Sequence, residues 1–182
     1  MSFPGLRTGF CALLVAALFL TTAAGAAVDY SSTLKAGKAQ LKSAGPLAFG
    51  PDGILFVGDS AGAVIFAVDT GDRKAGRAPA TFEIKAINEK IAALLGTTAD
   101  QILINDMAVN PISKRAYLSV SRGRGPEATP VILRTDATGK LEEVSLDNVK
   151  HARVELPNAP APDAKDRRGT ALRQEAITDL AF

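Results

Sequence analysis

Residues 46–69 read PLAFGPDGILFVGDSAGAVIFAVD and contain three short apolar segments separated by two segments rich in Gly, Asp and Ser. Apolar runs of this length, bounded by Gly, Pro and Asp, are typical of strands joined by tight turns. The stretch therefore predicts three strands of one antiparallel sheet. The strands are expected at residues 47–49, 54–58 and 63–68, and the turns at residues 50–53 and 59–62.

The flanking segments extend this first unit to residues 45–85. Residues 81–85 read TFEIK, and their alternation of apolar and polar side chains predicts a fourth strand. Residues 28–44 are polar and carry three lysines. We expect them to form a lead-in that adds an outer strand to the first or the last unit of the chain, with the lysines in solvent.

Residues 86–100 form an insertion after the first unit. Ile87, Ile91 and either Leu94 or Leu95 recur at helical spacing, and Gly96 follows where a helix C-terminus is expected. The insertion therefore predicts a short helix, and its apolar stripe is expected to pack on the sheets.

The order of segments repeats in residues 101–148. LAF at residues 47–49 corresponds to MAV at 107–109, and LAF returns at 180–182. The copies are widely spaced because each interval holds an insertion. The second insertion, residues 149–175, is rich in Pro, Ala and charge and predicts a long surface loop. The later strands of the second copy are expected at residues 115–120, 131–135 and 141–146.

The segment GPLAFGPDGILFVGDSAGAVIFAVD, residues 45–69, resembles a blade of the NHL and SMP-30 (gluconolactonase-like) group of six-bladed β-propellers. In that group an inner strand of the LAF type precedes a Pro-Asp-Gly turn and a second strand of the LFVGDS type. The resemblance covers residues 45–146 and residues 178–182. It implies β-propeller blades but no particular activity, because such blades serve both enzymes and binding proteins.

The expected fold class is all-β, an incomplete β-propeller of about two blades plus the start of a third, with one inserted short helix. Two blades leave a ring open, so we expect a truncated member of the group that associates with itself through its exposed blade face. The predicted boundaries are a signal peptide at residues 1–27, a lead-in at 28–44, blade 1 at 45–85, a helical insertion at 86–100, blade 2 at 101–148, a Pro-rich surface loop at 149–175 and the start of blade 3 at 176–182.

Residues 1–27 contain the three parts of a secretory signal peptide: a basic start, the apolar core CALLVAALFL, and small residues at Ala24 and Ala26 for cleavage. Cleavage is expected after Ala26 or Ala27, which places the mature chain in a periplasm or outside the cell. An uncleaved membrane anchor over residues 10–28 is the alternative.

Composition excludes several classes of partner. The chain has 21 Lys and Arg against 19 Asp and Glu, so it creates no strong field towards nucleic acid or anionic lipid. It has no Trp and few aromatic residues, which argues against a base-stacking surface. Cys11, the only cysteine, leaves with the signal peptide, so no internal disulfide is expected. The expected partner is a small ligand or a protein, not nucleic acid and, after signal cleavage, not a membrane.

Residues 58–62 read GDSAG, which matches the G-x-S-x-G motif that carries the nucleophilic serine of α/β-hydrolases. That motif requires a strand-to-helix turn, whereas these residues join two predicted strands. The only histidine, His151, lies at the polar start of the second insertion. The context favours a plain hairpin turn over a nucleophile.

Residues 121–125 read SRGRG and place Arg122 and Arg124 between glycines. Such a loop offers cationic side chains and accessible backbone N–H groups to a carboxylate or a phosphate. The alternative, which we favour, is a solvated hairpin loop.

Asp106 and Asp179 occupy equivalent positions immediately before the inner strand of successive copies, and Asn105 precedes the first of them. We expect them near the mouth of the central channel. They would either bind Ca²⁺ or a polar substrate, or accept backbone N–H bonds that tie neighbouring blades together. Pro46 takes this position in the first copy and breaks the ring of carboxylates, which favours the structural role. The candidate ligand-binding residues are Asn105, Asp106, Asp179, Arg122 and Arg124.

The sequence therefore predicts an exported β-propeller scaffold that binds a small ligand or a protein partner, with no identifiable catalytic residue and no required cofactor. The alternative is a Ca²⁺-dependent hydrolase of the SMP-30/gluconolactonase-like type, with Ca²⁺ as its cofactor at the channel mouth. A structural surface protein without a small ligand is a third interpretation.

Overall fold

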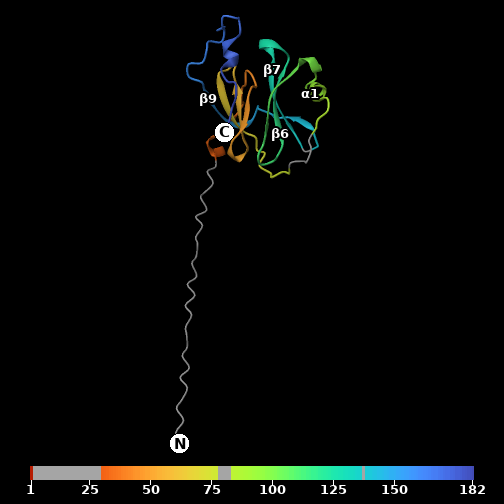
Figure 1. Ribbon diagram of the computed structural model, residues 1–182, viewed down its shortest axis with the longest axis vertical. Helices are drawn as coiled ribbons and strands as arrows, with labels where there is room; N and C mark the ends of the chain where they lie inside the picture. Colours follow the sequence, from red (N-terminus) through yellow and green to blue (C-terminus); the bar gives the residue numbers. More distant parts are fainter. Residues whose placement is uncertain (2–29, 78–82, 137) are drawn as a thin grey trace.

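The computed structural model describes residues 1, 30–77, 83–136 and 138–182. These residues form two antiparallel sheets that lie side by side, with one α-helix on the far side of the second sheet (Figure 1). The predicted signal peptide lies outside the described residues except for Met1. The strands are β1 (Lys35–Gly37), β2 (Leu47–Phe49), β3 (Ile54–Asp59), β4 (Val64–Asp69), β5 (Ile102–Val109), β6 (Ala116–Arg122), β7 (Thr129–Thr135), β8 (Leu141–Glu143) and β9 (Val149–Glu155); the α-helix is α1 (Ile87–Leu95), and short 3₁₀ helices span Tyr30–Thr33, Pro51–Gly53, Ala99–Gln101, Gly125–Glu127 and Leu172–Glu175.

The first sheet has the strand order β1-β9-β4-β3-β2. Strands β2, β3 and β4 are the three strands expected within residues 46–69, and they pair antiparallel as neighbours. The turn between β2 and β3 has Asp52 and Gly53 at φ 57° and 70°, a left-handed conformation that Asp tolerates and Gly adopts freely. Local turn chemistry therefore sets this part of the fold.

The fourth strand of the first sheet differs from the prediction. It is β9, which pairs with β4 from Val68↔His151 to Val64↔Glu155, and β1 of the lead-in lies outside it. In the segment predicted as the fourth strand, residues 83–85 belong to no strand, and residues 81–82 lie outside the described residues. Residues 149–155 are consequently a strand and not part of a surface loop. Residues 81–85 and residues 149–155 both alternate apolar and polar side chains. The alternation alone therefore does not predict which of the two segments pairs with β4.

The second sheet has the order β5-β6-β7-β8. A β-bulge between Ile104 and Asp106 interrupts the pairing of β5 with β6. Helix α1 covers the face of this sheet that points away from the first sheet, where Ile91 packs against Leu118 and Leu133. The helix ends at Leu95, and Gly96 caps it in the left-handed conformation that the sequence predicts.

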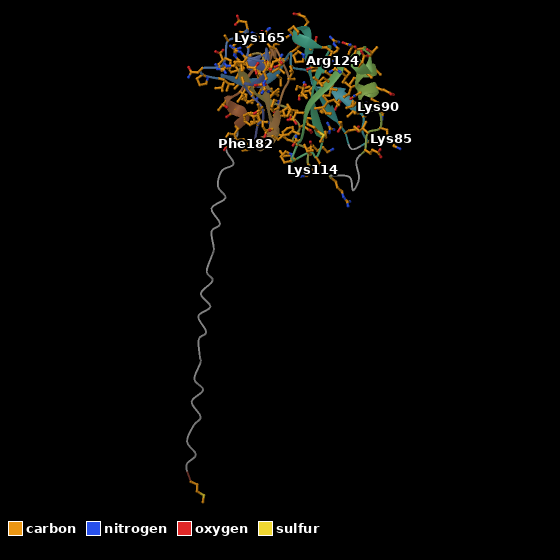
Figure 2. All side chains as sticks on the ribbon, turned by 45° about the horizontal axis from the view of Figure 1, so that its top comes forward. Lys85, Lys90, Lys114, Arg124, Lys165 and Phe182 are labelled. Carbon is orange, nitrogen blue, oxygen red and sulfur yellow. The ribbon has the colours of Figure 1, made fainter. Side chains whose placement is uncertain are left out.

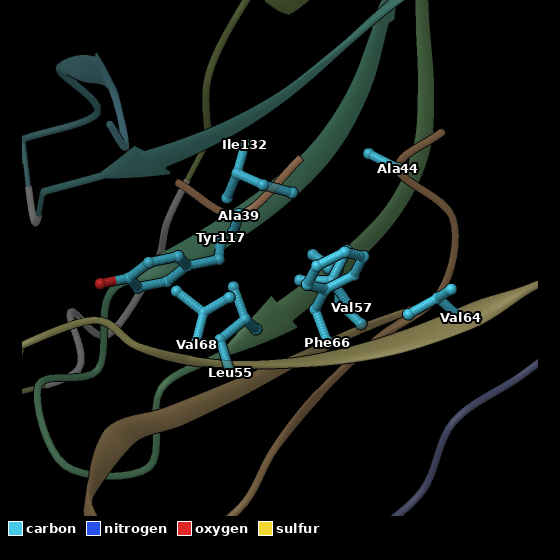
Figure 3. Packing of buried hydrophobic residues seen from close by; sticks show 10 residues of the cluster. Ala39, Ala44, Leu55, Val57, Val64, Phe66, Val68, Tyr117 and Ile132 are labelled. Carbon is cyan, nitrogen blue, oxygen red and sulfur yellow. The ribbon is translucent and has the colours of Figure 1, made fainter. Parts of the chain in front are cut away.

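The main core lies between the two sheets. Leu55, Val57 and Phe66 of the first sheet pack against Tyr117 and Ile132 of the second (Figure 3). We call the face of the first sheet that carries these residues its inner face, and the opposite face its outer face. The protein is thus mostly β, with two packed antiparallel sheets and one helix.

Residues 176–182, predicted to start a third blade, form no strand, and no strand among the described residues pairs with them. They lie instead against the first sheet. Ile177 is buried, and its Cγ2 lies 3.0 Å from the position of a Cβ added to Gly58. The ring of Phe182 stacks on that of Phe56 at a centroid distance of 5.8 Å.

A buried polar network joins the two sheets at the end of β4. The Asp72 carboxylate accepts hydrogen bonds from the Ser113 hydroxyl at 2.6 Å and from the Tyr117 hydroxyl at 3.0 Å. The Asn110 side-chain amide donates to the Asp72 carbonyl at 2.9 Å. Burial raises the pKa of the Tyr117 hydroxyl, although hydrogen bonding to Arg134 acts in the opposite direction.

Tyr117→Phe is expected to lower the free energy of unfolding at pH 8 by about 1 kcal/mol, because the hydroxyl bond to Asp72 is lost. The raised pKa means that the unfolded chain ionises first, above about pH 10. Neutral Tyr117 therefore makes its whole contribution to the free energy of unfolding below that pH. This contribution is lost as the pH rises through the pKa of Tyr117 in the folded state. The free energy of unfolding is measured with urea at about pH 8 and pH 10.5. Its decrease between these two pH values should be smaller for Tyr117→Phe than for the wild type. Exposed Tyr30→Phe is the control, and equal losses in all three proteins would contradict the prediction.

Candidate functional site

A cleft of about 650 Å³ opens at one end of the two sheets. Five segments form its walls: residues 42–46 before β2, the β3–β4 turn, the first half of β5, the β6–β7 connection and residues 174–179. Four of the five residues predicted from the sequence line it, namely Asn105, Asp106, Arg124 and Asp179; Arg122 does not.

Asp106 links the two sheets at the base of the cleft. Its Oδ2 accepts the backbone N–H of Leu47, the first residue of β2, at 2.7 Å, and its Oδ1 accepts the N–H of Met107 at 2.7 Å. The bulge in β5 sets the position of this carboxylate. Both oxygens therefore accept backbone N–H groups, and the bond to Leu47 connects β5 of the second sheet to β2 of the first.

Asn105 lies beside Asp106 and supports a different wall. Its Nδ2 donates to the carbonyl oxygen of Ala44 at 2.7 Å and to the Ser121 hydroxyl at 3.0 Å. The Oδ1 atom of the amide has no hydrogen-bond donor among the described residues. Asn105 therefore offers a positioned acceptor on an exposed residue of the cleft.

Asp179 makes only a local contact. Its Oδ1 accepts the N–H of Leu180 at 2.8 Å, which reproduces the bond from Met107 to Asp106. It has no bond corresponding to that of Asp106 with Leu47, and its second oxygen has no hydrogen-bond partner in the described part of the chain. Asp179 thus leaves an acceptor in the cleft.

The two arginines of the predicted cationic loop bind carbonyl oxygens of the protein. Arg124 donates from Nε and Nη2 to the carbonyl of Asp100 at 2.9 and 2.7 Å, and from Nη2 to that of Ile102 at 3.2 Å. Arg122 donates from Nη1 to the carbonyl of Leu95, at the C-terminus of α1, at 3.3 Å. A cation is favourable at a helix C-terminus. Arg124 remains in the cleft wall, whereas Arg122 stabilises the helix end away from it.

Asp59 is a determinant of the cleft that sequence reasoning missed. The residue is 1% exposed, and its carboxylate accepts the N–H groups of Lys42, Ser43 and Gly62 and the hydroxyl of Ser43, each at 2.8 Å. These bonds fix the segment before β2 that forms one wall. An Asp at a strand end before a Ser-x-Gly turn was the available signal, since Asp readily accepts turn amides.

The GDSAG motif is a hairpin turn between β3 and β4. Ser60 donates its hydroxyl to the carbonyl of Ile177 at 3.1 Å and so anchors residues 174–179 against the turn. His151 lies in β9, with its Nδ1 3.1 Å from the carbonyl oxygen of Val149. The two residues make no contact, so the nucleophile interpretation of the motif has no geometric support.

No three His, Cys, Asp or Glu side chains among the described residues come close enough together to hold a metal ion. The carboxylates of Asp106 and Asp179 therefore lack a third such ligand within that part of the chain. The described residues likewise include no helix with the length and apolar character needed to cross a bilayer.

Comparison with protein-family models, with curated proteins and with solved structures finds no match for this chain. The β-propeller resemblance therefore stays a prediction.

Proposed function

We propose that this chain is an exported, propeller-type scaffold that binds a small polar ligand in the cleft between its two sheets. The signal-peptide pattern of residues 1–27 supports export. The proposal of a binding role without catalysis rests on the cleft, because ligand sites are concave and combine apolar walls with a few positioned polar groups.

The propeller interpretation has support in how the repeated segments are arranged. The LAF segment at residues 47–49 lies in β2, and the MAV segment at residues 107–109 lies in β5. Each of these strands is an edge strand of its own antiparallel sheet, and the two strands lie side by side. Asp106 ties them together through Leu47. Radial packing of sheets around such inner strands is the propeller arrangement.

The main support for this proposal is that several polar side chains of the cleft form no hydrogen bond or ion pair within the described part of the protein. Gln174, Glu175 and Thr178 have no side-chain hydrogen bond or ion pair among the described residues, and neither does the Lys42 ammonium. The free oxygens of Asn105 and Asp179 add acceptors. A ligand in the cleft is therefore offered both donors and acceptors.

The charge of the lining sets the ligand class further. The lining contains two cationic side chains, Lys42 and Arg124, and three carboxylates, those of Asp106, Glu175 and Asp179. The net charge of the cleft is therefore close to zero. A strongly charged polyanion or polycation finds no complementary field here. Leu103, which is 45% exposed, provides an apolar surface in the same cleft. The arrangement suits a small ligand with several hydrogen-bonding groups, little net charge and an apolar part.

A thermal-shift screen with neutral polyols, sugars, amino acids and small organic acids tests the proposal. We expect at least one of these classes to raise the melting temperature of the wild type and of Arg167→Trp, which changes an exposed residue outside the cleft. Thr178→Trp fills the cleft and should abolish the shift, since stabilisation by a ligand requires binding to the native site.

The proposal fails if no class binds, or if the Thr178→Trp variant responds like the wild type. Ca²⁺ is included in the same screen. A Ca²⁺-dependent shift that Thr178→Trp removes would instead favour the Ca²⁺-dependent hydrolase that the sequence left as its alternative.

A further inference from the structure

Asn105 lies at a β-bulge in the wall that the second sheet contributes to the cleft. The register of β5 with β6 shifts between Ile104 and Asp106, so Asn105 has no partner residue in β6. Bulges redirect side chains and are frequent beside active sites. The amide nitrogen of Asn105 is held by two hydrogen bonds, one to the segment before β2 and one to β6. Its Oδ1 atom, which has no donor among the described residues, is therefore an acceptor whose position both sheets fix.

A hydrogen-bond donor and an apolar side chain lie beside this acceptor. Ser121 pairs with Leu103 in the register of β5 and β6, and both residues line the cleft. Directly opposite residues of an antiparallel pair have their side chains on the same face of the sheet. The Ser121 hydroxyl accepts the amide of Asn105, and its own proton has no acceptor in the described part of the chain. This wall therefore offers an acceptor, a donor and the exposed side chain of Leu103 next to one another.

The cleft also contains opposite charges that the described residues leave unpaired. Lys42 belongs to the segment before β2, and Glu175 ends the 3₁₀ helix at residues 172–175. Neither side chain forms an ion pair or a hydrogen bond with another described residue. Arg124 uses Nε and Nη2, but not Nη1, to bind carbonyl oxygens. Figure 2 shows Arg124 at one end of the second sheet and Lys114 at the other. Groups of both signs are thus available to a ligand at the Arg124 end.

The segments that carry Lys42 and Glu175 are held by one turn. The backbone N–H of Lys42 donates to the Asp59 carboxylate at 2.8 Å. Ser60, the next residue after Asp59, donates its hydroxyl at 3.1 Å to the carbonyl of Ile177, which closely follows Glu175 in the chain. The backbone around both charged residues is therefore fixed before a ligand binds. A preformed site lowers the entropic cost of binding, because no loop has to be ordered.

We propose that the ligand of the cleft is a zwitterion with an apolar side chain, namely a free amino acid or a short peptide; this inference rests on the binding function proposed above. The ligand carboxylate binds Lys42 and Arg124. The ligand ammonium binds Glu175 and the Oδ1 atom of Asn105, and the apolar side chain lies on Leu103. An ammonium has only donors and a carboxylate has only acceptors, so each end of the ligand matches one of these pairs.

Other small ligands fit this lining less well. A neutral sugar would remove water from both charges without supplying an opposite charge to either. A simple anion would meet the two cations, but it would also meet the carboxylate of Glu175, which repels it. A zwitterion pairs with charges of both signs and leaves the net charge of the cleft unchanged.

Calorimetry of the full chain with leucine, N-acetyl-leucine and leucinamide tests the two charges of the ligand separately. Leucine should bind one-to-one, and each blocked form should bind about tenfold or more weakly, because it lacks one charged group. Lys42→Gln should weaken the binding of leucine by about fivefold or more and should not weaken that of leucinamide, which has no carboxylate. Glu175→Gln should weaken the binding of leucine but not that of N-acetyl-leucine, which has no ammonium.

Lys90→Gln and Glu89→Gln are the matched controls, because both residues are exposed on α1 and lie outside the cleft. Both control variants should bind leucine like the wild type. All four variants should melt nearly like the wild type without ligand, since none of the four side chains forms a hydrogen bond or an ion pair among the described residues.

Titration with the dipeptide leucyl-leucine identifies the form of the ligand. Tighter binding of the dipeptide assigns the cleft to peptides, and tighter binding of leucine assigns it to free amino acids. The proposal is overturned if neither compound binds, or if Lys42→Gln weakens leucine and leucinamide equally. If another class of the thermal-shift screen binds while leucine and its dipeptide do not, the binding function stands and only the zwitterion is wrong. If no class binds, both proposals fail.

Discussion

Replacing Asp59 with alanine is expected to lower the free energy of unfolding by about 4 kcal/mol, because four hydrogen bonds to a buried carboxylate are lost together. Three backbone N–H groups and the Ser43 hydroxyl would then lack their acceptor. The variant should also lose the fixed position of residues 42–43, and with it one wall of the cleft.

Chemical denaturation measures this loss, and Asp147→Ala is the matched control. Asp147 has a side chain that is 73% exposed and pairs with Lys38 at 2.7 Å. Such a surface ion pair contributes at most about 1 kcal/mol, so the control should unfold nearly like the wild type. Asp59→Asn keeps one oxygen and should fall between the two. If Asp59→Ala unfolds like Asp147→Ala, the carboxylate does not organise the turn as described.

Sequence reasoning succeeded where structure is set by local chemistry. Strands β2, β3 and β4 follow from turn residues at fixed places, and Gly96 marks the end of α1 because few other residues adopt its conformation cheaply. It failed for β9, whose pairing with β4 joins segments far apart in the chain. Alternation indicates that a segment suits a strand, but not which strand will lie beside it.

Prediction of the candidate site from the sequence likewise succeeded for some residues and failed for others. The repeat placed Asp106 and Asp179 at equivalent positions, with Asn105 next to the first of them, and all three residues line one cleft. The sequence gives no sign that Arg122 bonds the end of α1, since the acceptor is the backbone carbonyl of Leu95. Asp59 was missed for the same reason, as most of its partners are backbone N–H groups that no residue letter reveals.

Asp106→Ala is expected to lower the free energy of unfolding by about 2–3 kcal/mol, since hydrogen bonds to a charged acceptor are worth about 1.5–3 kcal/mol each and water can replace part of this at a half-buried position. The bond to Leu47 joins the two sheets, so its loss should loosen β2 against β5. Hydrogen exchange should then show faster exchange of the Leu47 amide.

Asp179→Ala is the matched variant, because Asp179 has the equivalent place in the repeat and the same local bond, here to Leu180, without a bond between sheets. It should change the stability by no more than about 0.5 kcal/mol. The comparison therefore isolates the contact between sheets from the local one. Equal effects of the two substitutions would mean that the local bond, common to both, carries the stability. A stable Asp106→Ala variant that loses the thermal shift of the ligand screen would instead assign Asp106 to ligand binding, because the carboxylate would then matter only when the cleft is occupied.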